Sequence, residues 1–515
     1  MTSPPTTKTL TRNQYRLALG TCFLTIIVAI LDQNIVSAAL VPITSDLDPA
    51  HGLDLAPWVV TAFTLAGTAA VPLYGRLCDL YGPRRVFLQV VAVFVVGSIL
   101  CGMSQTMLQL VLFRALQGLG AGGLISVTMI VAAHLTMVKP QDPAKPRKKN
   151  SGGAPSGLAG LVFVVGMTVG PPVGGVFADH GIWRWIFYVN LPLGAVILIG
   201  ALAVFRFPRR PATGSIDFVG TALVAAFAGC LLLAGDWGGD RYAWNSPTII
   251  GLASATVVTL TLFLWRQSVT TSPIMPLRLF TIPAVRNSYI IQWLQGMSLT
   301  GVIVYLLMYL QIVRGISATT TGTFLIFLAG GILISGLLAE RLDTPTRTAM
   351  VAGTATATTA LLLLYRLTGP DTSLWLIRGE LTLLGLGFGL MIGRLITVVQ
   401  DAASGPQMGV AIAGVRFFQL LGGATGVALL GTVSRRLYES EAPGVELTTI
   451  PTLTGAAHTS ATTAFADSVR VSFAVAAGFM ALAAVFATRL RRPDPTGSEH
   501  APPQPTTAPT RDVTV

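Results

Sequence analysis

The chain has 515 residues, of which 52% are hydrophobic and only 11% are charged, and its formal net charge is +12. Soluble globular proteins carry about 25% charged residues, so this composition excludes an ordinary soluble domain and predicts a polytopic membrane protein. The positive charge lies in short loops between apolar runs. That distribution is the topology signal of a membrane protein and argues against a nucleic-acid partner.

Apolar segments long enough to cross a lipid bilayer, which takes about 20 residues, recur throughout the sequence. We expect fourteen membrane-spanning helices near 17–43, 57–78, 86–103, 107–133, 157–178, 186–205, 216–235, 248–266, 288–312, 320–340, 349–367, 374–399, 408–432 and 470–488. Basic residues concentrate in one set of connecting loops, which predicts a multi-pass protein of the cell membrane with both termini in the cytoplasm. The polar stretch 434–469 predicts a long outer loop.

The helices are expected to form an all-α fold of two six-helix bundles, helices 1–6 and 9–14, with two helices inserted between them. The expected divisions are a cytoplasmic tail at 1–16, a bundle at 17–206, two inserted helices with linkers at 207–287, a second bundle at 288–488 and a disordered cytoplasmic tail at 489–515. Similar glycine-rich stretches eight helices apart, QGLGAGGL and GLGFGLMIG, support this repeat. Transporters commonly show such repeats, and the alternative is chance similarity between closely packing helices.

The first expected helix carries one formal charge, Asp32, near its middle. A carboxylate at that depth costs roughly 2.5–3.5 kcal/mol on insertion scales, so Asp32 is protonated, partnered or facing water. In the fourth helix, Arg114 and Gln117 are three residues apart and lie on one side. An intramembrane arginine is a functional hypothesis by default and needs a partner. The alternative is a structural arginine that reaches the interface.

Two further stretches contain glycines at places where helices turn or bend. GRLCDLYGPRR joins helices 2 and 3, and its opposite charges predict a cytoplasmic gate, unless it is an ordinary charged loop. The expected gate residues are Gly75, Asp79, Gly82, Arg84 and Arg85. GMTVGPPVGG in helix 5 predicts a conformational element that binds no ligand, because its prolines bend the helix and its glycines allow close packing. Its motif residues are Gly166, Gly170, Pro171, Pro172, Gly174 and Gly175.

Together these stretches resemble the major facilitator superfamily, and in particular its fourteen-helix drug:proton antiporter branch, the EmrB/QacA-like exporters. LDQNIVSAALVPI is similar to the branch's first-helix motif and GRLCDLYGPRR to the superfamily's gate motif. The stretch around Arg114 and Gln117 is similar to the conserved arginine motif, and GPPVGG to the antiporter signature. The resemblance implies export by alternating access, driven by the proton gradient with no cofactor. It also implies proton coupling at Asp32, with Arg114 as the nearby cation.

The substrate cavity is expected between the two bundles, where transporters commonly bind their substrates. The candidate substrate-binding residues are Gln33, Asn34, Gln117, Trp293, Gln295, Met297, Tyr305, Tyr309, Arg416, Phe417, Phe418 and Gln419. Each aromatic residue among them is either a ligand contact or a helix-packing residue. Arg416 meets either an anionic substrate or an internal acid. Aromatic and methionine-lined pockets suit promiscuous apolar ligands.

Three functions compete at this point. The first is export of hydrophobic drugs or antibiotics, and the second is export of an endogenous lipid, siderophore or other metabolite. The third is a non-transporting membrane sensor or scaffold, which has no need of a midplane acid. The sequence has no Walker A motif and no histidine cluster spaced for metal binding, so we expect neither an enzyme nor a metal site. We expect a monomer in the bilayer whose partners are protons and a small hydrophobic substrate.

Overall fold

The fold is described from a computed structural model of the chain. It describes residues 11–48, 52–137, 166, 170, 173–177, 180–205, 215–239, 241–342, 344–403, 407–445 and 447–490. These residues form helices and their connections, with one isolated β-bridge between Gly238 and Tyr242. The described part of the chain is therefore essentially all-helical, as the sequence predicts.

The first group of helices runs in chain order through the N-terminal half. It comprises α1 (Arg12–Ile35), η1 (Val36–Ala39), α2 (Leu40–Leu47), α3 (Gly52–Tyr81), α4 (Pro83–Met103), α5 (Met107–Met137), α7 (Trp185–Tyr188) and α8 (Asn190–Val204). Two helices follow, α9 (Phe218–Trp237) and α10 (Pro247–Val269). The C-terminal half comprises η2 (Leu277–Thr281), α11 (Pro283–Ile312), α12 (Ala318–Thr323), α13 (Leu325–Arg341), α14 (Thr346–Leu367), α15 (Leu374–Met391), α16 (Arg394–Ala402), α17 (Met408–Glu441), η3 (Leu447–Thr452) and α18 (Gly455–Thr488).

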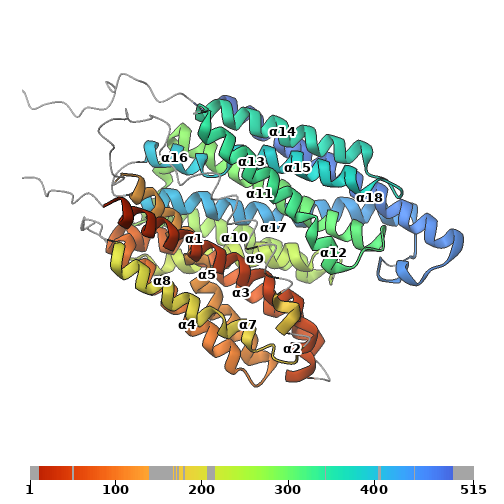
Figure 1. Cartoon of the computed structure of the whole chain (residues 1–515), viewed down its shortest axis with the longest axis horizontal. Coiled ribbons are helices and arrows are strands. Elements are labelled where there is room, and N and C mark those ends of the chain that lie inside the picture. The colour runs from red at the N-terminus through yellow and green to blue at the C-terminus, as the bar shows by residue number, and fades with distance from the viewer. Residues whose placement is uncertain are drawn as a thin grey trace, which may run out of the picture.

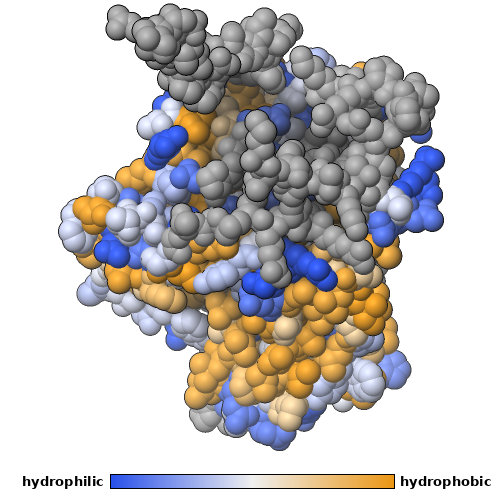
Figure 2. All heavy atoms as spheres, turned by 90° about the vertical axis from the view of Figure 1, so that its left-hand side faces the viewer, coloured by the Kyte–Doolittle hydropathy of each residue, from blue (hydrophilic) through white to orange (hydrophobic). Residues whose placement is uncertain are grey.

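Thirteen helices in the described part of the chain are long and apolar enough to cross a membrane. The expected fifth span, 157–178, lies mostly outside the described residues, so the number fourteen stays a prediction. Large apolar side chains on the surface, such as Ile199 (68% exposed) and Val257 (65% exposed), suit helices that face lipid. Figure 2 shows a broad apolar surface on the visible described face. The chain is a multi-pass membrane protein.

Local chemistry explains where several helices begin or break. Thr11 caps α1, because its side chain accepts a hydrogen bond from the Gln14 amide while Gln14 bonds back to the Thr11 amide, which is a capping box. Gly82 has φ +86° and is followed by Pro83 at the first turn of α4. A glycine adopts such a φ without strain, and proline suits a helix start. This pair makes the turn inside GRLCDLYGPRR.

Two expected elements differ from the structure. The predicted long outer loop at 434–469 is wrong, because α17 continues to Glu441 and α18 begins at Gly455. Alanine favours helices, and the Thr462 hydroxyl bonds back to the His458 carbonyl at 2.8 Å, so a polar composition is compatible with a helix here. The expected helix 374–399 is interrupted at Gly393, which has φ +78°.

The helices pack into two large groups around separate buried clusters (Figure 1). Helices α1 to α8 form one side of the molecule, and α11 to α18 form the other (Figure 1). Helix α17 lies between them, since its residues Ile412, Phe417 and Leu421 belong to the buried cluster of the N-terminal half. The two halves therefore meet along α17, and a site between them must include this helix.

Candidate functional site

A buried polar cluster joins α1, α4, α5 and α8. Arg114 Nη1 lies 3.0 Å from Asp32 Oδ2, and Gln117 Nε2 donates to Asp32 Oδ1 at 2.8 Å. Asn190 Nδ2 donates to the same Oδ1 at 2.6 Å, and Ser98 Oγ accepts from both amides at 2.7 and 3.1 Å. The Asp32 carboxylate therefore has three donors, one of them charged.

The guanidinium of Arg114 makes further contacts besides the one with Asp32. Its Nη1 also donates to Gln117 Oε1 at 2.7 Å, and its Nε donates to the Val59 carbonyl at 3.2 Å. Its Cζ lies 3.9 Å from the centroid of the Phe63 ring, a distance at which a cation is attracted to an aromatic face. Several separate contacts therefore fix the orientation of the Arg114 side chain.

Burial makes this cluster sensitive to any change of charge. Asp32 is 0% exposed and Arg114 is 1% exposed. Removing one partner of such a pair leaves an uncompensated buried charge, which costs about 3–5 kcal/mol. The cluster is consequently less stable with one of the two charges than with both or with neither. A proton added to Asp32 alone therefore favours a rearrangement of Arg114.

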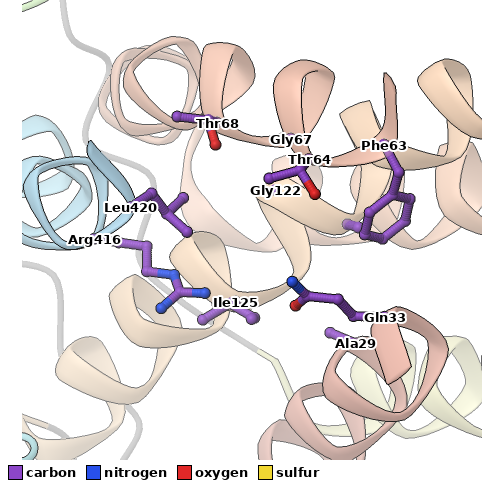
Figure 3. Close-up of a pocket in the computed structure, with 11 residues that line it drawn as sticks. Ala29, Gln33, Phe63, Thr64, Gly67, Thr68, Gly122, Ile125, Arg416 and Leu420 are labelled. Atoms are coloured by element: carbon purple, nitrogen blue, oxygen red, sulfur yellow. The ribbon is translucent and has the colours of Figure 1, made fainter. Parts of the chain in front are cut away.

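A cavity lies directly beside this cluster. It is lined by Ala29, Gln33, Phe63, Thr64, Gly67, Thr68, Ala121, Gly122, Ile125, Arg416 and Leu420. The lining comes from α1, α3 and α5 of one half and from α17 of the other. In Figure 3 the side chains of Gln33 and Arg416 approach the same space from opposite sides. Phe63 lines the cavity and also contacts Arg114, so one aromatic ring separates the cavity from the buried ion pair.

Arg416 is the only charged residue among those that line the cavity. Its Nη1 donates to Gln419 Oε1 at 2.6 Å, and Gln419 is neutral. Arg416 forms no ion pair with an acid in the described part of the chain. An arginine carries five N–H donors, so most of the hydrogen-bonding capacity of Arg416 remains for a molecule in the cavity.

The structure separates the other predicted substrate-binding residues from this cavity. Gln117 belongs to the Asp32 cluster instead, and Asn34 donates to the Ile30 carbonyl of its own helix at 2.7 Å. Tyr309 is buried and donates to the Gly369 carbonyl at 2.6 Å, so it joins helices within the C-terminal half. The remaining candidates outside the lining, most of them in helix packing, are Trp293, Gln295, Met297, Tyr305, Phe417, Phe418 and Gln419.

Several of those remaining candidates contact neighbouring helices in this structure, and their role in substrate binding stays a prediction. Trp293 donates to Thr425 at 3.2 Å, and Tyr305 donates to the Val427 carbonyl at 3.2 Å, so both bind α17. Phe418 stacks on Tyr289 with ring centroids 4.9 Å apart. The aromatic side chains of α11 and α17 mainly hold these two helices together, which was the alternative interpretation.

The predicted gate motif does bridge the two halves, but in a different way from the one expected. Asp79 does not pair with an arginine of its motif. Its carboxylate accepts hydrogen bonds from the backbone amides of Gly409 at 2.7 Å and Val410 at 3.0 Å, at the N-terminus of α17. A helix N-terminus has free N–H groups and a positive dipole, so it is a good partner for an acid.

The other gate residues surround this contact. A side chain on Gly75 would place its Cβ 2.7 Å from Ala413 Cβ, so only glycine allows α3 to approach α17 so closely. Arg84 donates to the Leu202 carbonyl at 3.1 Å, and Arg85 is exposed. The expected clamp of opposite side-chain charges is therefore replaced by an acid on a helix end.

The glycine motif of helix 5 packs on α1 beside Asp32. A Cβ on Gly166 would lie 2.7 Å from Ile30, and one on Gly170 would lie 3.0 Å from Asn34. Gly174 is buried, Gly175 has open space around its Cβ position, and Pro171 and Pro172 lie outside the described residues. The contacts agree with a role in helix packing.

Three contributors to the cluster could not be singled out from the sequence. Asn190 and Ser98 are uncharged, and the Val59 contribution is a backbone carbonyl. The sequence WRWIFYVNLPLG includes Asn190 inside an apolar stretch, and a lone buried amide there is the one available signal.

The packing of α3 on α5 recurs between α13 and α15. A Cβ on Gly67 would meet the carbonyl oxygen of Gly118 at 3.2 Å, and one on Gly331 would meet the carbonyl oxygen of Thr382. Each residue of the second contact stands 264 positions after its counterpart in the first. The same offset relates Arg114 to Arg378. The two halves thus repeat a backbone contact and an arginine.

The fold and the site define a class before any relative is considered. Membrane-spanning helices in two groups, with a buried ion pair beside a cavity between the groups, describe a transporter. Residues 22–427 match the Major Facilitator Superfamily. The chain belongs to this family.

Named relatives lead to the same class. The chain is 31% identical over 407 residues to the multidrug transporter protein MdtP of Bacillus subtilis, covering 78% of this chain and 72% of that protein. It is 29% identical to multidrug resistance protein 3 of the same organism, covering 81% and 79%. It is 35% identical to an uncharacterized MFS-type transporter of Mycobacterium tuberculosis, covering 79% of this chain but only 58% of that protein. The chain therefore spans little more than half the length of that relative.

Solved structures share the fold. The human organic anion transporter MFSD10 matches with a TM-score of 0.62 at 15% identity, covering 92% of this chain and 99% of that one. A variant of the Escherichia coli fucose:proton symporter FucP matches with a TM-score of 0.56 at 13% identity, covering 93% and 100%. At these identities the likeness concerns the fold alone.

Proposed function

We propose that the protein is a proton-coupled antiporter that exports hydrophobic drugs or antibiotics across the cell membrane by alternating access. The observation that carries this proposal is the Asp32–Arg114 pair, buried at 0% and 1% exposure beside a cavity between the two halves. Membership of a transporter family and relatives named as multidrug transporters support export. The proton gradient is the driving force, no cofactor is required, and the monomer has both termini in the cytoplasm.

Asp32 is the proposed proton site. As a carboxylate it is stabilised by Arg114, Gln117 and Asn190. Adding a proton to Asp32 removes its negative charge, so Arg114 loses its counter-charge. A conformation in which Arg114 has other hydrogen-bond acceptors then becomes more favourable. The cluster thus has two states, one with Asp32 ionised and paired and one with Asp32 protonated. A proton and a substrate can shift the equilibrium between these states in opposite directions.

Phe63 is the proposed link between substrate and proton. Its ring lines the cavity and lies 3.9 Å from the Arg114 guanidinium. A substrate that displaces this ring disturbs the contact that orients Arg114, and hence the pair with Asp32. At the cytoplasmic end, the contact of Asp79 with the Gly409 and Val410 amides closes the path and must break when the cavity opens inwards.

Arg416 indicates the charge class of the substrate. A cation in the cavity wall without an acid partner among the described residues favours a ligand that brings its own negative charge. The rest of the lining is mainly apolar, with Gln33, Thr64 and Thr68 as polar groups. We expect an apolar body with one anionic group. A drug and an endogenous metabolite of this kind fit equally, and a panel of compounds distinguishes them.

The proposal is tested by transport in proteoliposomes under an imposed proton gradient, with internal pH and compound flux recorded together. The Asp32→Asn/Arg114→Gln double variant removes both buried charges, so it keeps a neutral cluster while it lacks the proton site. We expect it to fold and to lose proton-coupled flux. Glu439→Gln, on an exposed residue, is the matched control and keeps full flux. Undiminished coupled flux in the double variant would exclude Asp32 as the proton site.

A further inference from the structure

A second acid is buried in the membrane-spanning part of the C-terminal half. Glu380 lies in α15, within the candidate span Leu374–Ala402, and is only 3% exposed. Neither of its carboxyl oxygens has a hydrogen-bond partner among the described residues. Buried polar groups are nearly always hydrogen-bonded, and each exception calls for an explanation. The buried Asp32, by contrast, accepts three hydrogen bonds.

The charged and titratable groups around Glu380 do not neutralise it. On its own helix, Arg378 is directed towards aromatic rings, with Cζ 4.3 Å from the Trp375 ring centroid and 4.9 Å from that of Phe324. Helix α13 carries no titratable residue between 325 and 339. Helix α14 has Tyr365 and Arg366 at one end and Arg347 at the other.

Tyr309 of α11 interacts electrostatically with Glu380. Its hydroxyl donates to the Gly369 carbonyl, so it is not a donor to the acid. Arg314 and Asp371 also interact with Tyr309, and the Arg314 guanidinium donates to the Pro370 carbonyl. None of the five ion pairs in the described part of the chain includes Glu380.

An ionised carboxylate without donors is strongly disfavoured in such surroundings, whereas the neutral acid is tolerated. We propose that Glu380 is a proton-binding site, that it carries a proton in this conformation, and that it is distinct from the Asp32 site. This site does not depend on the proposed transport function.

The repeated packing of the two halves places this acid near the counterpart of the N-terminal site. Arg378 occupies the position 264 residues after Arg114, and Gly296 stands at that distance after Asp32. The C-terminal half has therefore kept the arginine and lacks an acid at the equivalent position of its first helix. Its buried acid, Glu380, is two residues from Arg378 on the same helix. Residues at this spacing do not face each other, so the two do not form an ion pair. The second half thus holds a carboxyl group without the ion pair.

Infrared difference spectroscopy of the full-length protein tests this directly. A protonated carboxyl group has a C=O stretching band that a carboxylate and an amide lack, and the band shifts in D₂O. We expect Glu380→Gln to lose one such band at neutral pH. Glu439→Gln, on an exposed residue, is the control and is expected to lose none. A protonated-carboxyl band that persists unchanged in Glu380→Gln overturns the proposal.

A labelling experiment on the wild-type protein needs no variant. Dicyclohexylcarbodiimide enters from the lipid and reacts with a protonated carboxyl, whose O–H adds across one C=N bond of the reagent. Mass spectrometry at neutral pH should find label on Glu380 at several-fold higher occupancy than on Asp32 or on the exposed Glu439. Equal labelling of Glu380 and Glu439 means that burial does not hold a proton on Glu380, and contradicts the proposal. Both readouts remain informative if the protein transports nothing.

Discussion

The two halves of the molecule treat a buried acid in opposite ways. In the N-terminal half, Asp32 accepts hydrogen bonds from Arg114, Gln117 and Asn190. In the C-terminal half, Glu380 is equally buried and has no hydrogen-bond partner among the described residues. The contact of α3 with α5 recurs between α13 and α15 at an offset of 264 residues. The two halves therefore share a helix contact, but one holds a fully paired acid and the other an acid without donors among the described residues.

This difference teaches that burial alone does not decide the charge of an acid in the membrane-spanning part. The hydrogen-bond donors around the acid decide its charge. Asp32 is on α1, where α4, α5 and α8 supply amide and guanidinium groups, whereas Glu380 is on α15 among apolar helices. Replacing a fully paired carboxylate by an amide should lower the free energy of unfolding strongly. Replacing a protonated carboxyl by an amide should lower it little.

The largest expected effect comes from breaking the paired site. Asp32→Asn leaves Arg114 buried without a counter-charge, and we expect the free energy of unfolding to fall by about 3–5 kcal/mol. Glu380→Gln replaces a neutral acid by an amide of the same shape, and we expect no comparable loss. Chemical unfolding in detergent, followed by intrinsic tryptophan fluorescence, measures both.

A double variant checks the cause of this loss. Asp32→Asn/Arg114→Gln removes both charges and should recover most of the stability that Asp32→Asn loses, because no unpaired charge remains. If the loss of stability in the double variant, relative to the wild type, equals the sum of the losses in Asp32→Asn and Arg114→Gln, the two side chains do not interact and the contrast between the halves fails. Equal losses for Asp32→Asn and Glu380→Gln also contradict it.

Much of this arrangement could be predicted from the sequence, and the exceptions have physical causes. Long apolar runs define membrane spans because backbone groups in lipid must bond within a helix. Asp32 and Arg114 were identifiable because a charge inside such a run needs a partner, and the structure places them 3.0 Å apart. Gly75 and Gly82 are found where close packing and a positive φ require glycine.

The remainder depends on partners that no sequence pattern specifies. The Val59 carbonyl and the Gly409 amide belong to the backbone, so their roles follow only from how the helices meet. The aromatic residues of α11 are suitable for ligand binding and for helix packing alike, and the structure assigns Tyr309 to packing. Glu380 lies in an apolar run, as Asp32 does, but the sequence does not show that it lacks hydrogen-bond donors.

A second, smaller effect concerns the unpaired cation in the cavity. If Arg416 binds an anionic group of the substrate, Arg416→Gln should remove a charge-assisted hydrogen bond of about 1.5–3 kcal/mol, which is roughly tenfold or more in KM. We expect this change for an aromatic carboxylate but not for its methyl ester, which has the same apolar body. Flux of both compounds into proteoliposomes gives the comparison.

Arg416→Lys serves as the control, because it keeps the positive charge and should retain most of the preference for the carboxylate. If Arg416→Gln lowers transport of acid and ester equally, Arg416 supports the helix and does not select substrate charge. Coupled flux of the ester in every variant would show that the antiport itself is intact. The proposed selection of substrate charge by Arg416 and the proposed proton-coupled antiport can thus fail separately.

The smallest effect is expected for an ion pair on the surface. It tests whether burial, and not pairing alone, makes the contribution of the Asp32–Arg114 pair to stability large. Arg184 and Asp46 are 2.8 Å apart on the surface, with 36% and 49% of their side chains exposed. The hydrogen bond from Arg184, followed by one from Trp183, lowers the pKa of Asp46 from its ordinary value of 3.8.

Because the folded-state pKa of Asp46 is the lower one, the pair contributes stability above the ordinary pKa and loses it as the pH falls through the folded value. A double-mutant cycle of Asp46→Asn and Arg184→Gln should therefore give a coupling of less than about 1 kcal/mol at neutral pH. That coupling should shrink at high salt and vanish at a pH well below 3.8. A coupling as large as that of Asp32 with Arg114 would mean that pairing, and not exclusion of water, sets the strength of both, and the distinction between the paired and the neutral buried acid would lose its basis.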